Sequence, residues 1–290
     1  MPKFQRIMVD GGFTCPNRDG TVGSGGCSYC RNDSFAPDYC RKTKSITEQL
    51  EAGKRFFGQK YKDMQYIAYF QSYSCTYAPI DVLRQRYEDA LSAGVKGLVI
   101  GTRPDCLQEE VPDLLEEFKA RTQLKIEIGV ESCHDHVLQR INRGHTYVQA
   151  EDAIRRTSAR GIKVGAHIIL GLPEETREEM LQGADLLSEL PVDFIKLLQL
   201  QILKGTKMAE DFMNHPEVFV TFPSAEDYVG LVKKYRRHLR SDIQIGRYVS
   251  SAPSDLIIAP RWGLKPYEIK ALIEQCAQKK NTKTTTGNTL

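Results

Sequence analysis

Three cysteines near the amino end of the 290-residue chain have the type and spacing of metal ligands. Eleven residues separate Cys15 from Cys27, and two separate Cys27 from Cys30. Four glycines between the first two cysteines allow the backbone to fold tightly around a bound group. Three thiolates are one fewer than the four that fill an iron–sulfur cluster or a structural zinc site. The motif therefore favours an iron–sulfur cluster with one iron open to an external ligand.

Two other chemistries fit part of this motif. A zinc site would need a fourth ligand, and because the loop contains no histidine, Cys40 is the nearest candidate. A redox dithiol would use only Cys27 and Cys30. Such pairs normally open a helix after a strand, and they have no use for Cys15.

The elements that must position these cysteines alternate along the chain. Short apolar runs rich in β-branched residues alternate with longer segments of helical period, which is typical of parallel βα units. Strands are predicted at residues 5–9, 65–70, 97–102, 125–130, 163–170 and 194–200, and helices at 46–57, 79–93, 109–120, 147–160, 174–190 and 207–214. Six such units predict an α/β fold, a partial open (βα)6 TIM-type barrel with its chemistry at the carboxyl ends of the strands. Its open side would admit a large substrate.

The pattern changes after residue 203. An amphipathic helix is predicted at 224–240, a strand at 243–249 and a final helix at 265–278. Because no linker separates these elements from the rest, we expect a core barrel over 1–205 and a small C-terminal α/β appendix over 206–278, packed on the barrel. Residues 279–290 have no apolar period, so they are predicted to form a disordered tail.

Composition excludes several classes of protein. Lys and Arg number 40 and Asp and Glu 37, and a net charge of +3 excludes a polycationic nucleic-acid coat or an acidic tail protein. With 41% hydrophobic residues, the chain can build a sizeable core. No run of about twenty apolar residues is present, so no membrane partner is expected. The amino terminus lacks an apolar signal core, which predicts a cytoplasmic protein with reduced thiols.

Several motifs, in their order, resemble those of radical S-adenosylmethionine (SAM) enzymes. The three cysteines, with Tyr29 just before the last, follow the first predicted strand, and their long first gap is similar to that of the group built around the elongator catalytic subunit. The runs GGFTCPNRDGTVGSGGCSYC, IAYFQSYSCTYAP, GTRPDCL, INRGHTY, HIILGLPEET and LKGTKM resemble the small single-domain radical SAM proteins of that group. The resemblance covers about residues 5–275.

The resemblance implies two cofactors. A [4Fe–4S] cluster would be held by Cys15, Cys27 and Cys30, and its open iron would bind the amino and carboxylate groups of SAM. An electron from the reduced cluster would break a carbon–sulfur bond and release a 5′-deoxyadenosyl radical. The protein then has to bind, orient and exclude competing reactions. A reductant such as flavodoxin or ferredoxin is implied as a partner.

The resemblance also implies which residues contact SAM. Tyr29 lies within the cysteine motif, and Gln71 and Ser72 follow the second strand, where the family binds the methionine amino group. Glu131 ends the fourth strand, where a carboxylate suits a ribose diol; otherwise it is a solvated strand-end carboxylate.

Three further residues have two interpretations each. Arg143 either binds the methionine carboxylate through its bidentate fork or is an exposed arginine of a helix turn. His167 lies in an apolar strand, where it either contacts cofactor or substrate or is a hydrogen-bonded core histidine. Cys75 follows the second strand, where it either donates a hydrogen atom to a radical or packs inertly.

The expected substrate follows from the resemblance alone. It implies modification of the side chain at position 5 of the tRNA wobble uridine, specifically trimming of carboxymethylaminomethyl to aminomethyl. Residues 233–240 carry five basic residues, which either contact RNA phosphates or form a solvated helix face. The expected partner is thus tRNA and not DNA. The alternatives are a radical SAM enzyme acting on a small metabolite or tetrapyrrole, and a non-catalytic iron–sulfur adaptor.

Overall fold

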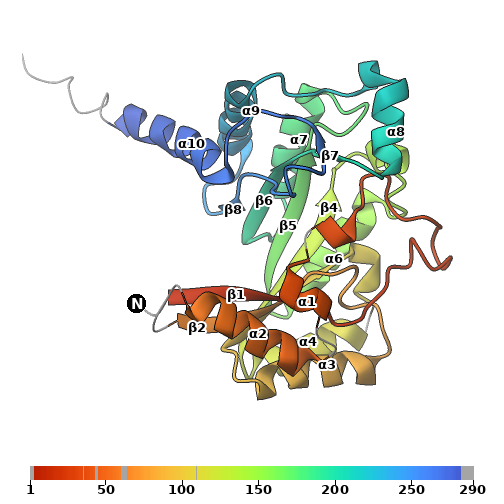
Figure 1. Ribbon diagram of the computed structural model, residues 1–290. Helices are drawn as coiled ribbons and strands as arrows, with labels where there is room; N and C mark the ends of the chain where they lie inside the picture. The colour runs from red at the N-terminus through yellow and green to blue at the C-terminus, as the bar shows by residue number, and fades with distance from the viewer. Residues whose placement is uncertain (1–2, 35, 43–44, 60–63, 109, 282–290) are drawn as a thin grey trace, which may run out of the picture.

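The computed structural model describes residues 3–34, 36–42, 45–59, 64–108 and 110–281. Seven strands form one curved sheet in the order β1-β2-β3-β4-β5-β6-β8, and every neighbouring pair is parallel (Figure 1). The strands are β1 Lys3–Val9, β2 Met64–Phe70, β3 Gly97–Thr102, β4 Gln123–Glu131, β5 Lys163–Leu170, β6 Phe194–Gln199 and β8 Gln244–Arg247. Since β1 and β8 are edge strands of this sheet, the fold is the partial open TIM-type barrel that the sequence predicts.

Helices connect the strands and pack on the outside of the sheet (Figure 1). They are α1 Asp38–Lys42, α2 Ile46–Gly58, α3 Ile80–Ser92, α4 Glu110–Lys119, α5 Asp135–Arg140, α6 Tyr147–Ala159, α7 Arg177–Ser188, α8 Lys207–Asn214, α9 Ala225–His238 and α10 Pro266–Asn281. The helices α1 and α5 fall outside the predicted elements because they are too short to show a helical period. No described helix is long and apolar enough to cross a membrane.

Capping residues fix where several helices begin. Ser45 caps α2 in a capping box with Glu48. The helix predicted from residue 174 begins instead at Arg177, because the Thr176 side chain accepts a hydrogen bond from the Glu179 backbone N–H. Glu174 lies before this cap with φ +65°, a backbone conformation that a helix cannot contain.

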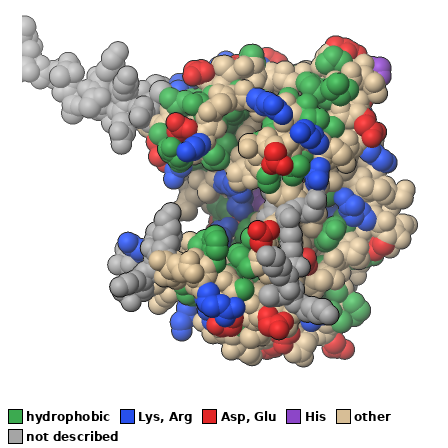
Figure 2. Space-filling view, in the orientation of Figure 1, with side chains coloured by type: hydrophobic (Ala, Val, Ile, Leu, Met, Phe, Trp, Pro, Cys, Tyr) green, Lys and Arg blue, Asp and Glu red, His purple; other side chains and the backbone are tan. Residues whose placement is uncertain are grey.

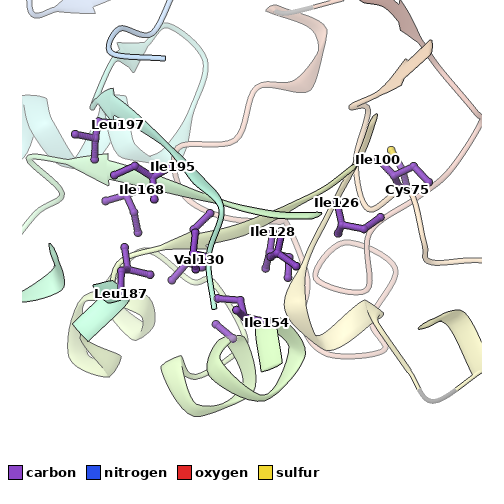
Figure 3. Close-up of a cluster of buried hydrophobic side chains, with 14 of the residues drawn as sticks. Cys75, Ile100, Ile126, Ile128, Val130, Ile154, Ile168, Leu187, Ile195 and Leu197 are labelled. Atoms are coloured by element: carbon purple, nitrogen blue, oxygen red, sulfur yellow. The ribbon is translucent and has the colours of Figure 1, made fainter. Parts of the chain in front are cut away.

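Alternation along the strands separates an apolar face from a polar one. Ile126, Ile128 and Val130 of β4 are fully buried in the layer that also contains Ile154 of α6 (Figure 3). Ile195 and Leu197 of β6 lie in the same apolar layer (Figure 3). Because successive side chains of a strand point to opposite faces, the residues between these apolar positions face the inside of the barrel.

The C-terminal part contributes to the main sheet, which corrects the six-strand count. β8 pairs in parallel with β6 and is thus a seventh strand of the barrel sheet. It is only four residues long, so its pattern did not indicate which edge it would join. The two short strands β7 Ile202–Leu203 and β9 Ile257–Ala259 form a separate antiparallel pair.

The last helix is longer than predicted. α10 extends to Asn281, three residues into the segment predicted to be disordered. Residues 282–290 of that segment lie outside the described part of the chain.

Candidate active site

A cavity opens at the carboxyl ends of the strands, where barrel folds of this kind place their chemistry. Figure 2 shows this face of the molecule hollowed, with basic side chains inside the hollow. The cavity has a volume of about 1390 Å³ including its open mouth. All three motif cysteines line it, together with Tyr29, Gln71, Glu131, Arg143 and His167. Eight of the nine residues that the sequence singles out as ligands or cofactor contacts therefore share one cavity.

The ninth residue, Ser72, does not line the cavity. Its side chain is 1% exposed, and its carbonyl accepts a hydrogen bond from the Cys75 thiol at 3.2 Å. The neighbours Gln71, Tyr73 and Ser74 line the cavity instead. Tyr73 has φ +62°, so the backbone turns sharply at this point and directs Ser72 into the protein.

The cysteine loop is shaped by glycines and held by Asn17. Gly25 and Gly26 have φ values of +78° and +80°, a conformation that side chains disfavour, directly before Cys27. The Asn17 amide donates to the carbonyl of Asn142 at 2.5 Å, and it lies 3.8 Å from the Cys27 sulfur. The loop is therefore tied to the segment that follows α5.

Two guanidinium groups lie beside the thiols. Arg143 Nη1 is 3.5 Å from Cys27 Sγ, and Arg18 Nη2 donates to the Cys30 carbonyl at 3.3 Å. Burial raises the pKa of the Cys30 thiol, and the interaction with Arg18 opposes that rise. Positive charge at this point favours thiolates, which are the form that binds iron.

The donor set fits a cluster better than a single ion. Within the described ranges, no three Cys, His, Asp or Glu side chains lie close enough together to hold one metal ion. The three thiols nevertheless line one cavity, and each iron of a cluster takes one thiolate, so its ligands stand farther apart than those of a single zinc ion. Cys15, Cys27 and Cys30 would hold a [4Fe–4S] cluster at this wall.

Arg143 is buried, so it is not the exposed arginine of a helix turn. Its Nη2 donates to the Gly129 carbonyl at 2.7 Å and lies 3.4 Å from the Glu131 carboxylate. Its Nε donates to His145 Nε2 at 2.9 Å. Burial and the charge of Arg143 lower the pKa of His145 to about 2, so the imidazole is neutral and can accept this bond. Arg143 thus connects Cys27 to the end of β4.

Glu131 ends β4 in a strained conformation. Its φ is +71°, and the pairing of β4 with β5 is irregular between Gly129 and Glu131. Such outliers in non-glycine residues occur where a site needs a side chain in one direction. A Cβ at Gly129 would lie 2.5 Å from the Glu131 carboxylate and 2.6 Å from Arg143 Nη2, so glycine leaves these two groups room in their present positions. Burial and the Glu131 charge also raise the pKa of the neighbouring Tyr29 hydroxyl.

His167 is hydrogen-bonded and also faces the cavity. It lines the cavity, and its Nε2 lies 3.0 Å from the Glu127 carboxylate. Cys75 lies in the hydrophobic core near Ile100 and does not line the cavity (Figure 3). Burial raises the pKa of its thiol, which agrees with the inert interpretation.

The sequence interpretation missed an ionic cluster around Glu127, which is 1% exposed. Its carboxylate accepts hydrogen bonds from Tyr69, Lys196 and Arg6 at 2.7, 2.5 and 2.8 Å. Burial alone would raise the pKa of Glu127, but His167, Lys196 and Arg6 outweigh it and hold the pKa well below its usual range. A charged residue between apolar ones, as Lys196 stands between Ile195 and Leu197, is the signal that was available.

The basic segment 233–240 lies outside the cavity. It begins in α9, which packs against α7 and α10, and none of its residues lines the cavity. Lys234, Arg236 and Arg237 are exposed. Arg240 donates to the carbonyls of Ser188 and Leu190 and pairs with Asp242, so its role is in part structural.

Comparisons with known proteins identify the family. The model of the Radical SAM superfamily matches residues 17–187, more than half of the chain, and that of the Radical SAM C-terminal domain matches residues 192–279. Protein YhcC of Escherichia coli K12 is 39% identical over 266 residues, which cover 90% of this chain and 82% of that protein. Uncharacterized protein YtqA of Bacillus subtilis is 36% identical over 274 residues, with coverages of 94% and 84%.

The elongator group is similar in sequence over part of the chain and in fold over nearly all of it. Human Elongator complex protein 3 is 31% identical over 118 residues, 39% of this chain and 21% of that protein. The structure of Methanocaldococcus infernus Elp3 matches with a TM-score of 0.72 at 16% identity, over 97% of this chain. This chain spans 64% of the length of that structure. The chain therefore belongs to the radical SAM superfamily, whose enzymes use a [4Fe–4S] cluster and SAM.

Proposed function

We propose that this enzyme converts the carboxymethylaminomethyl group at position 5 of the tRNA wobble uridine to aminomethyl. The observation that carries the proposal is the charge of the cavity. Six cationic side chains line it (Arg18, Arg31, Arg103, Arg143, Lys196 and Arg247) against the carboxylates of Glu127 and Glu131. Such an excess suits a polyanionic substrate, and the likeness to the elongator group directs the proposal to the wobble uridine.

When bound, the cluster and SAM supply a 5′-deoxyadenosyl radical that removes a hydrogen atom. The substrate would lose this atom from the methylene between nitrogen and carboxylate and then one electron, which together make a two-electron oxidation. Water adds to the resulting carbon–nitrogen double bond, so that glyoxylate leaves and the aminomethyl group remains. SAM would be the net oxidant and would end as methionine and 5′-deoxyadenosine.

In this scheme, the residues of the chain bind and orient SAM and the substrate. Glu131 would bind the ribose diol of SAM, and Gln71 would contact the methionine amino group. Arg143 is occupied by Cys27, Gly129 and His145, so we assign it to holding Glu131 and the cluster loop as well as to the methionine carboxylate. Tyr29 and His167 face the same space, whereas Ser72 would act only by shaping the turn after β2.

Partners follow from the same proposal. A reductant such as flavodoxin or ferredoxin would deliver the initiating electron. A tRNA extends well beyond the cavity, so the exposed basic residues of α9 (Lys234, Arg236 and Arg237) are available for phosphate contacts outside it.

The test is anaerobic. The protein is reconstituted with iron and sulfide, reduced, and given SAM with tRNA that carries carboxymethylaminomethyluridine. We expect 5′-deoxyadenosine, glyoxylate and aminomethyluridine in equal amounts. Cofactor cleavage without any change in the tRNA would reject this substrate and favour a small metabolite. Wobble nucleosides from deletion and parent cells, compared by mass spectrometry, give the same test in vivo, and identical spectra would reject the proposal.

A further inference from the structure

A row of three basic residues crosses the cavity wall formed by β5, β6 and β8. His167 pairs in register with Lys196, and Lys196 pairs in register with Arg247. Partners in register on neighbouring strands lie about 5 Å apart and point to the same face. All three side chains line the cavity. They form one continuous basic surface inside the barrel, which we call the basic row.

Arg247 joins the basic row because β8 contains one extra residue. Ile195 pairs with Ile245, but Lys196, the next residue of β6, pairs with Arg247, so Gly246 has no partner of its own. Regular alternation would direct position 246 into the cavity and Arg247 away from it. Bulges of this kind re-aim a side chain and are over-represented next to active sites.

Around the basic row, positive charges outnumber negative charges. Glu127 accepts hydrogen bonds from Lys196 of the basic row and from Arg6 of β1. Arg247 donates to the Val249 carbonyl at 2.7 Å and to the Ser251 hydroxyl at 2.6 Å, and both partners are neutral. In the part of the chain that the structure describes, no carboxylate forms an ion pair with Arg247. Three cations (Arg6, Lys196 and Arg247) therefore lie near a single carboxylate, that of Glu127.

This excess is unfavourable because Lys196 and Arg247 are largely withdrawn from solvent. Burial lowers the pKa of Lys196 to about 8, with Arg6 and Arg247 acting in the same direction and Glu127 against it. Burial likewise lowers the pKa of Arg247. An anion placed on the basic row would remove this penalty.

We infer that Lys196 and Arg247, with His167 beside them, bind a carboxylate group of the substrate. This inference rests on the proposed function, in which the group to be removed ends in a carboxylate. The planar guanidinium suits a carboxylate as a bidentate partner. The same cations would attract a phosphate as well, and the second experiment compares the two anions directly. The product keeps no carboxylate, so the basic row would hold the substrate and release the aminomethyl product.

The first experiment compares two anticodon stem-loops that differ only in the wobble side chain, carboxymethylaminomethyl or aminomethyl. We expect the wild-type protein to bind the first about tenfold more tightly, the value of one good charge-assisted contact. Arg247→Met should abolish this preference by weakening only the first loop. Lys196→Met combined with Glu127→Gln should do the same without leaving Glu127 short of a partner. Arg155→Met, which removes an exposed cation on the outside of α6, is the matched control.

The second experiment needs no RNA. Thermal unfolding is followed with N-methylglycine, methylamine or methyl phosphate. N-methylglycine should stabilise the wild-type protein and the Arg155→Met control but not Arg247→Met, because only a bound ligand shifts the folded state. Stronger stabilisation by methyl phosphate would overturn the assignment to a carboxylate.

The two experiments separate the inference from the proposed function. If neither loop binds but N-methylglycine stabilises through Arg247, the tRNA proposal fails and the carboxylate site stands. If both loops bind equally and N-methylglycine has no effect, the carboxylate site is overturned while tRNA binding stands. A preference for the first loop that survives Arg247→Met would also overturn it.

Discussion

The Arg143 guanidinium lies 3.5 Å from the sulfur of Cys27 and joins two distant parts of the chain.

 The two residues are 116 positions apart in the sequence. The other arm of the guanidinium donates to the Gly129 carbonyl at 2.7 Å. Arg143 therefore joins the cysteine loop to the end of β4, and the geometry of the cluster wall depends on this one side chain.

We expect Arg143→Met to lower the free energy of unfolding of the cluster-free protein by about 3 kcal/mol, because it leaves the Glu131 carboxylate, whose side chain is 12% exposed, without its partner. Arg143→Lys keeps the charge but loses the planar guanidinium, so its free energy of unfolding should lie between those of wild type and Arg143→Met. Urea unfolding measures both. The exposed Arg155→Met should stay within about 0.5 kcal/mol of wild type, and an equally small change in Arg143→Met would contradict the prediction.

Replacing Cys27 and Cys75 separates the two kinds of cysteine. Cys27→Ala should abolish cluster binding and leave the helical circular dichroism signal intact, because the cysteine loop lies outside the hydrophobic core. Cys75→Ala should keep its iron and lose about 1 kcal/mol of stability through a small cavity in the core. Iron content and unfolding curves check both variants. Loss of iron from Cys75→Ala would show that the core cysteine acts on the cluster.

The positive φ of Glu131 predicts a difference between two small replacements. Glu131→Gly and Glu131→Ala both remove the carboxylate, so both should weaken SAM binding equally. Only alanine retains the strain of a side chain at φ +71°, so the glycine variant should be more stable by about 1 kcal/mol. Urea unfolding of the cluster-free proteins measures this difference. A more stable alanine variant would mean that the loop relaxes when the carboxylate is removed.

Glu175 predicts a dependence of stability on pH. Burial raises its pKa to about 8, and the hydrogen bond from Ser132 only partly opposes this. The folded protein therefore keeps a proton up to about pH 8 that the unfolded chain releases near pH 4.5. Between these values the folded state binds more protons, so the free energy of unfolding falls as pH rises.

Glu175→Gln should remove this slope. Its stability relative to wild type should grow by a few kcal/mol from pH 4.5 to 8 and then level off, since one pKa unit corresponds to about 1.4 kcal/mol. Urea unfolding at pH 5, 7 and 9 tests this, with the exposed Glu178→Gln as control. Parallel curves for Glu175→Gln and wild type would refute the raised pKa.

Local pattern was enough to predict most of the elements. β3 and β5 have the predicted bounds because both are continuous apolar runs between turn signals. The cysteine spacing indicated a metal site, and the structure places all three cysteines on one cavity. Their ligand role stays a prediction that iron analysis must test.

The ionic residues inside the barrel were harder to predict. Alternation indicates that Glu127 and Lys196 lie opposite the apolar face of their strands, but it does not show that β4 and β6 bring them together across β5. The position of Arg247 in the cavity depends in addition on the extra residue Gly246. The sequence of so short a strand does not reveal such a bulge. The prediction that Ser72 lines the cavity was wrong because the backbone turns at Tyr73.

Because β8 pairs with β6, two regions of the chain contribute residues to one cavity. Cys27, Cys30 and Glu131 come from the region matched by the superfamily model, whereas Arg247 comes from the region matched by the C-terminal model. Residues proposed to hold the radical source and a residue proposed to hold the substrate thus lie in different matched regions. Exchange of the C-terminal segment between relatives would retarget the reaction while the radical source stayed the same.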